Sequence, residues 1–342
     1  MKLRQKCLSI TVACFWAFLA GPVSSLGSAT GDATDRSTET ETRRLMPAMK
    51  DIRVTVASMK SVLNDTSRNV GQVRRACEIA KKADARMVFL PECMLSGHGA
   101  HPKLMQNAEP VPEGPLSRTV IQMSKEYQLC ICVGIAELSN QLVYNSYMVV
   151  DKGKYLGLQR KINLSGDEYR YFAAGDSIEV FDIGDVRFGV SICFDNNFPE
   201  IALIHSFHNV DLILAPHAER TGQWPAVLTP EFCGAQINRQ QKKWEKMYVG
   251  QAYFHNVYIL ACNAVGSATD GLEGVVSNHA GTVMGVNPNG DIFLRTSATA
   301  IADEVVTVEL KSAGRKLGHR PSQNRRMSVV KNLFDSYFRT LE

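Results

Sequence analysis

The sequence predicts a single α/β domain in which strands alternate with helices along the chain. Runs of β-branched apolar residues alternate with segments whose apolar residues recur at helical spacing. The composition is that of an ordinary globular protein, with 45% hydrophobic and 21% charged residues in 342. No internal repeat and no second linker interrupts this pattern after residue 50. We therefore expect sheets that are covered by helices.

The domain begins with a strand, a helix and a second strand. Ile52, Val54 and Val56 alternate as in a strand. Asp65 or Ser67 can cap a helix whose apolar residues keep helical spacing, namely Val70, Val73, Ala76, Cys77 and Ala80. The apolar run 87–90 then predicts a short buried strand. This order is typical of a βαβ-like start.

The rest of the domain, which we expect to span 51–310, continues the alternation. Helices are expected over 116–127 and 199–207, and another before His255. Strands are expected over the ranges 130–136, 142–150, 186–192, 212–215 and 257–261. Cys130 and Cys132 lie on one face of their strand, where we interpret them as core residues.

The N-terminal end differs in composition from this domain. Residues 1–25 carry basic residues, then an apolar run, then small residues, which is the layout of a secretory signal peptide. The apolar run is shorter than the ~20 residues that a bilayer span needs, so we favour cleavage over an uncleaved anchor helix. Residues 26–50 have the composition of a disordered linker. We expect an exported protein, periplasmic or secreted, with no stable membrane span after cleavage.

Charge and cysteine content exclude further classes of protein. The formal net charge is only +4, whereas a nucleic-acid binder usually has a strongly basic domain, so no nucleic-acid partner is expected. Nine cysteines in 342 residues are too few for a disulfide scaffold. No pair of cysteines has the spacing of a structural zinc site.

Three strand ends carry reactive side chains. Glu92 follows the strand at 87–90, Lys161 stands at a strand or turn, and Cys193 ends an apolar strand before a helix. Residues just past the carboxyl ends of strands line the ligand crevice of open α/β sheets. A thiol near helix N-termini and beside a lysine would have a lowered pKa and would be a competent nucleophile.

Each of these residues also has a simpler interpretation. Glu92 could begin a solvated loop, or form a buried ion pair with Lys161. Cys193 could be a small buried hydrophobic residue, as most cysteines are. Because a thiol, a base and a cation occur together, we favour the catalytic interpretation.

In order and spacing these motifs resemble the Glu-Lys-Cys triad of the nitrilase superfamily, the carbon-nitrogen hydrolases. The similarity rests on Leu90-Pro91-Glu92, on Arg160-Lys161-Ile162-Asn163-Leu164, and on Ile192-Cys193-Phe194-Asp195 through Glu200. Glu168 falls where family members carry a second glutamate, whereas Asn163 departs from the histidine of many members. The resemblance covers about residues 52–310 and implies a four-layer αββα sandwich.

The resemblance also implies a hydrolase that needs no metal and no organic cofactor. Cys193 would attack the carbonyl carbon of a small amide, with Glu92 as the base that later passes the proton to the departing nitrogen. Lys161 and the backbone N–H of Phe194 would stabilise the oxyanion. Glu168 would hydrogen-bond Lys161 or the substrate. Water would then release a carboxylic acid from the thioester.

The substrate class stays open. Phe194-Asp195 after the nucleophile resembles the amidase and carbamoyl-hydrolase branches, so a small linear amide is the first expectation. The alternatives are a carbamoyl compound or a nitrile on the same triad, or a non-catalytic exported binding protein. Asn196 and Asn197 stand where carbamoyl hydrolases often have arginines. This disfavours an acidic substrate held from this loop, without excluding an arginine elsewhere.

Four further polar residues near these motifs invite a function. His217 and Glu219 are expected in another pocket wall, where they could select a polar or basic leaving group, with a solvated loop as the alternative. His98 and His101 suggest a metal site, but no third ligand is evident. Their glycine-rich surroundings instead favour a mobile lip near Glu92.

The C-terminal segment 311–342 holds eight Lys or Arg residues against two acidic ones. It could bind an anionic surface, or it could pack on a partner subunit. Its apolar side chains need burial, and family members commonly dimerise through terminal segments. We therefore favour packing at a subunit interface and expect a homodimer or a larger homo-oligomer.

Overall fold

The computed structural model describes residues 49–99, 101–269, 276–296 and 299–314, together with 329, 331–332, 335–336 and 339. All of them belong to one compact unit, Pro47–Glu342. The expected signal peptide at 1–25, the linker up to residue 48 and most of the basic tail lie outside the described residues. None of the helices in the described part of the chain is both long enough and apolar enough to cross a bilayer.

The first six-stranded sheet has the order β14-β1-β2-β3-β4-β5. Its strands are β14 (Glu304–Leu310), β1 (Ile52–Ser58), β2 (Met87–Phe89), β3 (Cys130–Ser139), β4 (Leu142–Asp151) and β5 (Lys154–Arg160). β1, β2 and β3 are parallel, whereas the other neighbours pair antiparallel. The carboxyl ends of the parallel strands therefore meet at one edge of the sheet.

The second six-stranded sheet has the order β13-β12-β9-β8-β7-β6. Its strands are β13 (Ile292–Arg295), β12 (Val283–Val286), β9 (Tyr258–Asn263), β8 (Leu212–His217), β7 (Arg187–Val190) and β6 (Val180–Asp182). Here β7, β8 and β9 are parallel. A small two-stranded sheet, β10 (Val265–Ser267) with β11 (Asn278–Ala280), follows β9.

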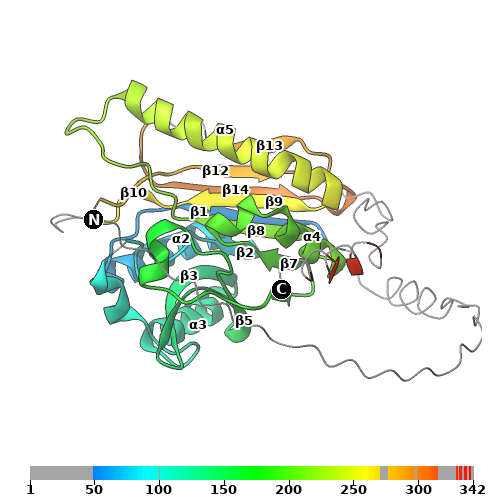
Figure 1. Ribbon diagram of the computed structural model, residues 1–342, viewed down its shortest axis with the longest axis horizontal. Coiled ribbons are helices and arrows are strands. Elements are labelled where there is room, and N and C mark those ends of the chain that lie inside the picture. Colours follow the sequence, from blue (N-terminus) through cyan, green and yellow to red (C-terminus); the bar gives the residue numbers. More distant parts are fainter. Residues whose placement is uncertain are drawn as a thin grey trace, which may run out of the picture. The chain divides into compact units, whose positions relative to one another are not determined.

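Helices pack on each sheet (Figure 1). α2 (Thr66–Lys82) and α3 (Pro115–Tyr127) cover the first sheet, and α4 (Pro199–Phe207) and α5 (Pro230–His255) cover the second. α2 begins after Asp65, whose side chain accepts from the Arg68 amide at 3.1 Å, so Asp65 rather than Ser67 is the cap. The short 3₁₀ helices are η1 (Pro102–Asn107), η2 (Gly166–Arg170), η3 (Cys193–Asn197) and η4 (Ser312–Gly314).

The main core lies between the two sheets. Apolar side chains from the inner faces of both sheets form it, among them Val54, Phe89, Cys132, Phe188, Leu214 and Leu260. Separate apolar clusters join α2 and α3 to the first sheet, and α5 to the second. The layers thus run helices, sheet, sheet, helices, which is the expected four-layer αββα sandwich. Glu92 follows β2, Lys161 follows β5 and Cys193 follows β7.

Candidate active site

Glu92 is carried by a turn that passes very close to β3. A Cβ on Gly134 of β3 would lie 2.1 Å from the Cys93 nitrogen and 2.7 Å from the Glu92 carbonyl carbon. Only glycine therefore allows this approach. The Tyr147 hydroxyl contacts the carbonyls of Leu90 and Cys132, the latter at 2.8 Å, and so fixes the chain just before Glu92.

Lys161 lies between two carboxylates. Its Nζ donates to Oε1 of Glu92 and to Oε1 of Glu168, each at 2.8 Å. Both the lysine and Glu92 are 1% exposed. Burial opposes the charge on Lys161, but the charge of Glu92, with Cys193 and Glu168, raises its pKa well above the ordinary value. The amine is therefore held as an ammonium ion next to the cavity described below.

Glu168 is positioned by η2, with one carboxylate oxygen bonded at the start of η2 and the other bonded to Lys161. Its Oε2 accepts from the backbone N–H and the hydroxyl of Ser165, at 2.7 and 2.9 Å, in a capping box. Burial disfavours its ionisation, yet the hydrogen bond from His98 and the charge of Lys161 lower its pKa below the ordinary range. The expected bond between Glu168 and Lys161 is therefore present, and Glu168 is a carboxylate.

Cys193 begins η3, separated by two residues from the end of β7, with a φ of +48°, in the left-handed region. Non-glycine residues with this backbone are uncommon and cluster at functional sites. Phe194, the second residue of η3, has its N–H in the first turn, where the helix provides no acceptor. The turn thus places the Cys193 thiol beside a backbone N–H that has no acceptor within the helix.

The expectation of a lowered thiol pKa is wrong for the free protein. Burial and the neighbouring carboxylate of Glu92 raise the pKa of Cys193 well above the ordinary value, and Lys161 only partly compensates. The sequence indicated the lysine and the helix, but not how close an anion would lie. The resting nucleophile is a neutral thiol, so its attack requires a base that removes the proton.

Asp195 connects the turn of Cys193 to the loop of Lys161. Its Oδ1 accepts from the backbone N–H of Asn163 at 2.7 Å and from the side-chain amide of Asn163 at 3.0 Å. Its Oδ2 accepts from the Ile192 N–H at 3.3 Å. Asn163, which departs from the histidine of many family members, therefore takes part in holding the two loops together.

The Asp195→Asn variant should change the pH dependence of stability. Burial raises the pKa of Asp195 from 3.8 to about 6. The free energy of unfolding is therefore unaffected by this group below pH ~4, where the carboxyl is protonated in both states, and falls as pH rises through ~6 and the buried carboxyl ionises. Relative to the variant, the wild type should lose on the order of 1–3 kcal/mol of unfolding free energy between these values. Urea unfolding at several pH values measures this difference, and parallel curves would contradict it.

The side chain of Asn145 on β4 contacts both buried carboxylates of this group, and sequence reasoning missed it. Its Nδ2 donates to Oε1 of Glu92 at 2.7 Å and to Oε1 of Glu168 at 3.3 Å. Its Oδ1 accepts from the Cys93 thiol at 3.4 Å, and its carbonyl accepts from the Lys161 N–H at 2.8 Å. The available signal was an amide side chain in a strand that is mostly apolar.

The Asn145→Ala variant should lose about tenfold to a hundredfold in kcat with little change in KM, because a hydrogen bond to a charged group contributes ~1.5–3 kcal/mol. Steady-state kinetics on any turned-over amide measures this. Ser146→Ala, the neighbour that donates to Glu137 at 2.6 Å, is the control and should keep its kcat. Equal losses in both variants would mean that Asn145 only supports the strand.

A cavity of about 280 Å³ lies over these groups. It is lined by Glu92, His98, Lys161, Ser165, Glu168, Cys193, Phe194, Asn197, Ala218, Glu219, Arg220 and Lys243. The three expected catalytic residues, the two supporting residues and two of the four expected pocket residues, Asn197 and Glu219, thus share one space. Ala218 also donates its N–H to Oε2 of Glu92 at 2.6 Å, which leaves no oxygen of that carboxylate without a donor.

The other two expected pocket residues lie elsewhere. Asn196 is buried beneath the turn, where its amide donates to the carbonyls of Ser191 and Cys193 at 2.8 and 3.0 Å. His217 is 1% exposed, and its Nε2 lies 2.6 Å from the Tyr248 hydroxyl behind the wall. Side chains alternate along β8, so His217 points into the helix layer while the following residues reach the cavity.

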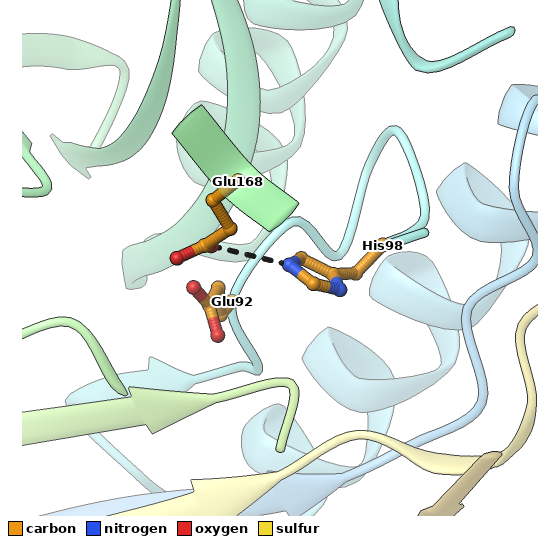
Figure 2. Close-up of side chains that lie close together, drawn as sticks. All are labelled: Glu92, His98 and Glu168. Atoms are coloured by element: carbon orange, nitrogen blue, oxygen red, sulfur yellow. Dashed lines mark hydrogen bonds and ion pairs between the residues drawn. The ribbon is translucent and has the colours of Figure 1, made fainter. Parts of the chain in front are cut away.

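His98 occupies the cavity rather than a lip at its edge. It is 6% exposed, and its Nε2 lies 3.3 Å from Oε1 of Glu168. Glu92, His98 and Glu168 each place one potential ligand atom within 4.8 Å of the others (Figure 2). The ammonium of Lys161 contacts both carboxylates, so a cation of the chain itself already compensates their charge. His101 instead caps η1.

Comparison with known proteins identifies the class that this fold and cavity define. A model of the carbon-nitrogen hydrolase family matches residues 53–316. The chain therefore belongs to the carbon-nitrogen hydrolase family, as the sequence motifs indicated.

Individual relatives share 30% or less of their residues with this chain over the matched regions. A nitrilase of Pyrococcus abyssi is 30% identical over 168 residues, 48% of this chain and 64% of that protein, so the match spans just under two thirds of the relative. Omega-amidase NIT2 of Homo sapiens is 27% identical over 258 residues, 71% of this chain and 82% of that protein. An amidase variant of Nesterenkonia sp. AN1 has the same fold, with a TM-score of 0.64, 17% identity, and coverage of 84% of this chain and 98% of that one.

Proposed function

We propose that the protein hydrolyses the non-peptide C–N bond of a small linear amide to a carboxylic acid and ammonia. The observation that carries this proposal is that Glu92, Lys161 and Cys193 line one small cavity. A thiol, a base and a fixed cation around one space are what nucleophilic acyl transfer requires.

The first half of the reaction forms a thioester. Glu92 takes the proton of the Cys193 thiol as sulfur attacks the carbonyl carbon, which turns the carbonyl oxygen into an oxyanion. The ammonium of Lys161 and the N–H of Phe194 stabilise that charge. When the tetrahedral intermediate collapses, Glu92 returns the proton to the nitrogen, and ammonia leaves.

In the second half Glu92 acts again as base and then as acid, now with water as the nucleophile. Glu92 removes a proton from a water molecule, whose oxygen attacks the thioester carbon. The second tetrahedral intermediate expels the Cys193 sulfur, which regains a proton from Glu92, and the carboxylic acid departs. Burial keeps the resting thiol neutral, so the first half needs a base for the thiol, and the second half needs one for water. Glu92 serves in both halves, and no reactant besides water is required.

Two relatives support this assignment. In the Nesterenkonia amidase variant, the acetamide moiety of fluoroacetamide is covalently added at the active-site cysteine, which supports a thiol nucleophile. The human relative is named for amide hydrolysis. N-carbamoylputrescine amidase of Solanum lycopersicum, 27% identical over 230 residues, makes carbamoyl compounds the first alternative to include in a test.

An ammonia-release screen tests the proposal. Neutral amides, carbamoyl compounds and nitriles are each incubated with the wild type and with Cys193→Ala. We expect amides to be turned over by the wild type and the variant to release no ammonia above background. Release at equal rates by both proteins would exclude Cys193 as nucleophile, and turnover confined to carbamoyl compounds or nitriles would replace the amide assignment.

A further inference from the structure

The cavity wall beyond the reacting groups is strongly polar. Its charged residues there are Glu219 and Arg220, which follow β8, and Lys243 on α5. Of the wall residues outside the Glu-Lys-Cys group and Glu168, only Phe194 and Ala218 are apolar. A substrate that fits this space must offer polar or charged atoms at the end away from the amide.

Arg220 has hydrogen-bonding capacity to spare. Its Nη1 donates to Oδ2 of Asp167 at 2.9 Å, and its Nη2 donates to Oδ1 of the same carboxylate. This end-on pair uses two of the five N–H donors of the guanidinium. Among the residues that the structure describes, no other side chain bonds Arg220, which is 31% exposed. The edge that contains Nε is therefore available for a second bidentate contact.

In contrast to Arg220, Glu219 has a hydrogen-bond partner for each of its side-chain oxygens. Its Oε1 accepts from Lys243 Nζ and its Oε2 from the Gln240 amide, each at 2.7 Å. Lys243 uses one of its three N–H donors in this bond. The hydrogen-bonding groups of this wall that lack a partner side chain are therefore mainly N–H donors of Arg220 and Lys243. Such cationic donors are complementary to a carboxylate rather than to an ammonium group.

We propose that Arg220 binds a carboxylate at the end of the substrate opposite the scissile amide, with Lys243 as the second positive group. Resting on the proposed function, this assigns the substrate class as the monoamide of a short dicarboxylic acid. The small cavity, about 280 Å³, limits the chain between the two ends to a few carbons. The loop after Cys193 has no arginine, and the loop after β8 supplies one instead.

Matched substrates test this assignment. The monoamides of succinic and glutaric acid are compared with the corresponding diamides, which have the same size and lack only the negative charge. We expect the wild type to prefer the monoamides in kcat/KM by about tenfold to a hundredfold, the value of a charge-assisted hydrogen bond. 5-Aminopentanamide, which ends in an ammonium group, should be the poorest substrate.

Two variants separate binding from support of the fold. Arg220→Gln should bring the monoamide-to-diamide ratio towards one, whereas Asp167→Asn, which frees the guanidinium, should keep or raise the ratio. Arg295→Gln, at an exposed ion pair with Glu245, is the control and should leave the ratio unchanged. If Arg220 only holds Asp167, then Arg220→Gln and Asp167→Asn will slow both substrates equally.

Each outcome bears on one of the two proposals. Equal turnover of monoamide and diamide by the wild type, or preference for the ammonium-ended amide, overturns the carboxylate assignment while amide hydrolysis stands. Absence of turnover with every amide, in a protein whose Cys193 is intact, overturns amide hydrolysis and the substrate class together.

Discussion

Lys161→Met is expected to lower kcat/KM by about a hundredfold to a thousandfold, the cost of losing one oxyanion donor, and to destabilise the fold. Lys161 is the ammonium that lies 2.8 Å from both Glu92 and Glu168. Without it two buried carboxylates face each other, at a cost of about 3–5 kcal/mol. The pKa of Glu168 should rise, so the variant should lose further stability as pH increases.

Urea unfolding across pH and steady-state kinetics measure these two effects separately. Lys311→Met is the control, because Lys311 pairs with Asp51 and Glu309 on the surface, and exposed pairs contribute only ~0–1 kcal/mol. A Lys161→Met protein that is less stable but keeps its rate when folded would reduce Lys161 to a structural ion pair. Wild-type stability would contradict the buried network itself.

Glu92→Gln is expected to lower kcat by about a hundredfold to ten-thousandfold, the contribution of a general base. The amide keeps the shape of the carboxylate but cannot take the thiol proton. At the same time, the variant should alkylate faster at Cys193, because the anion that helps to raise the pKa of this thiol is gone while Lys161 remains. A slower enzyme with a more reactive thiol is the combined signature of a base beside its nucleophile.

The rate of iodoacetamide labelling against pH, followed at the Cys193 peptide, measures the second effect. Glu109→Gln is the matched control, since Glu109 is also buried but accepts from the Ser117 amide at 2.7 Å, at the start of α3. It should leave both the labelling profile and kcat unchanged. Full kcat in Glu92→Gln would exclude Glu92 as the base.

The sequence predicts most of the fold and the centre of the site because both depend on local signals. Helix α4 begins and ends where its proline and its apolar spacing indicate. Glu92, Lys161 and Cys193 could be placed because each follows a strand, and strand ends meet at one crevice. The short strands β6 and β10 to β13 give too few residues for a periodic pattern, and pairing across the sheets defines them instead.

The residues that were missed act through contacts distant in sequence. Asn145 and Arg220 look like ordinary strand and loop residues until folding brings the first to Glu92 and the second to Asp167. His217 was expected in the wall because its segment follows a predicted strand, but the alternation along β8 turns it towards Tyr248. The raised pKa of Cys193 likewise depends on a distance to Glu92 that spacing does not reveal.

Mass spectrometry of an acid-quenched reaction tests the central claim most directly. During turnover of an amide, the peptide that contains Cys193 should gain the mass of the acyl group, and hydroxylamine should remove it, as expected for a thioester. An acyl group on any other residue would contradict the account, as would turnover by Cys193→Ala at the wild-type rate.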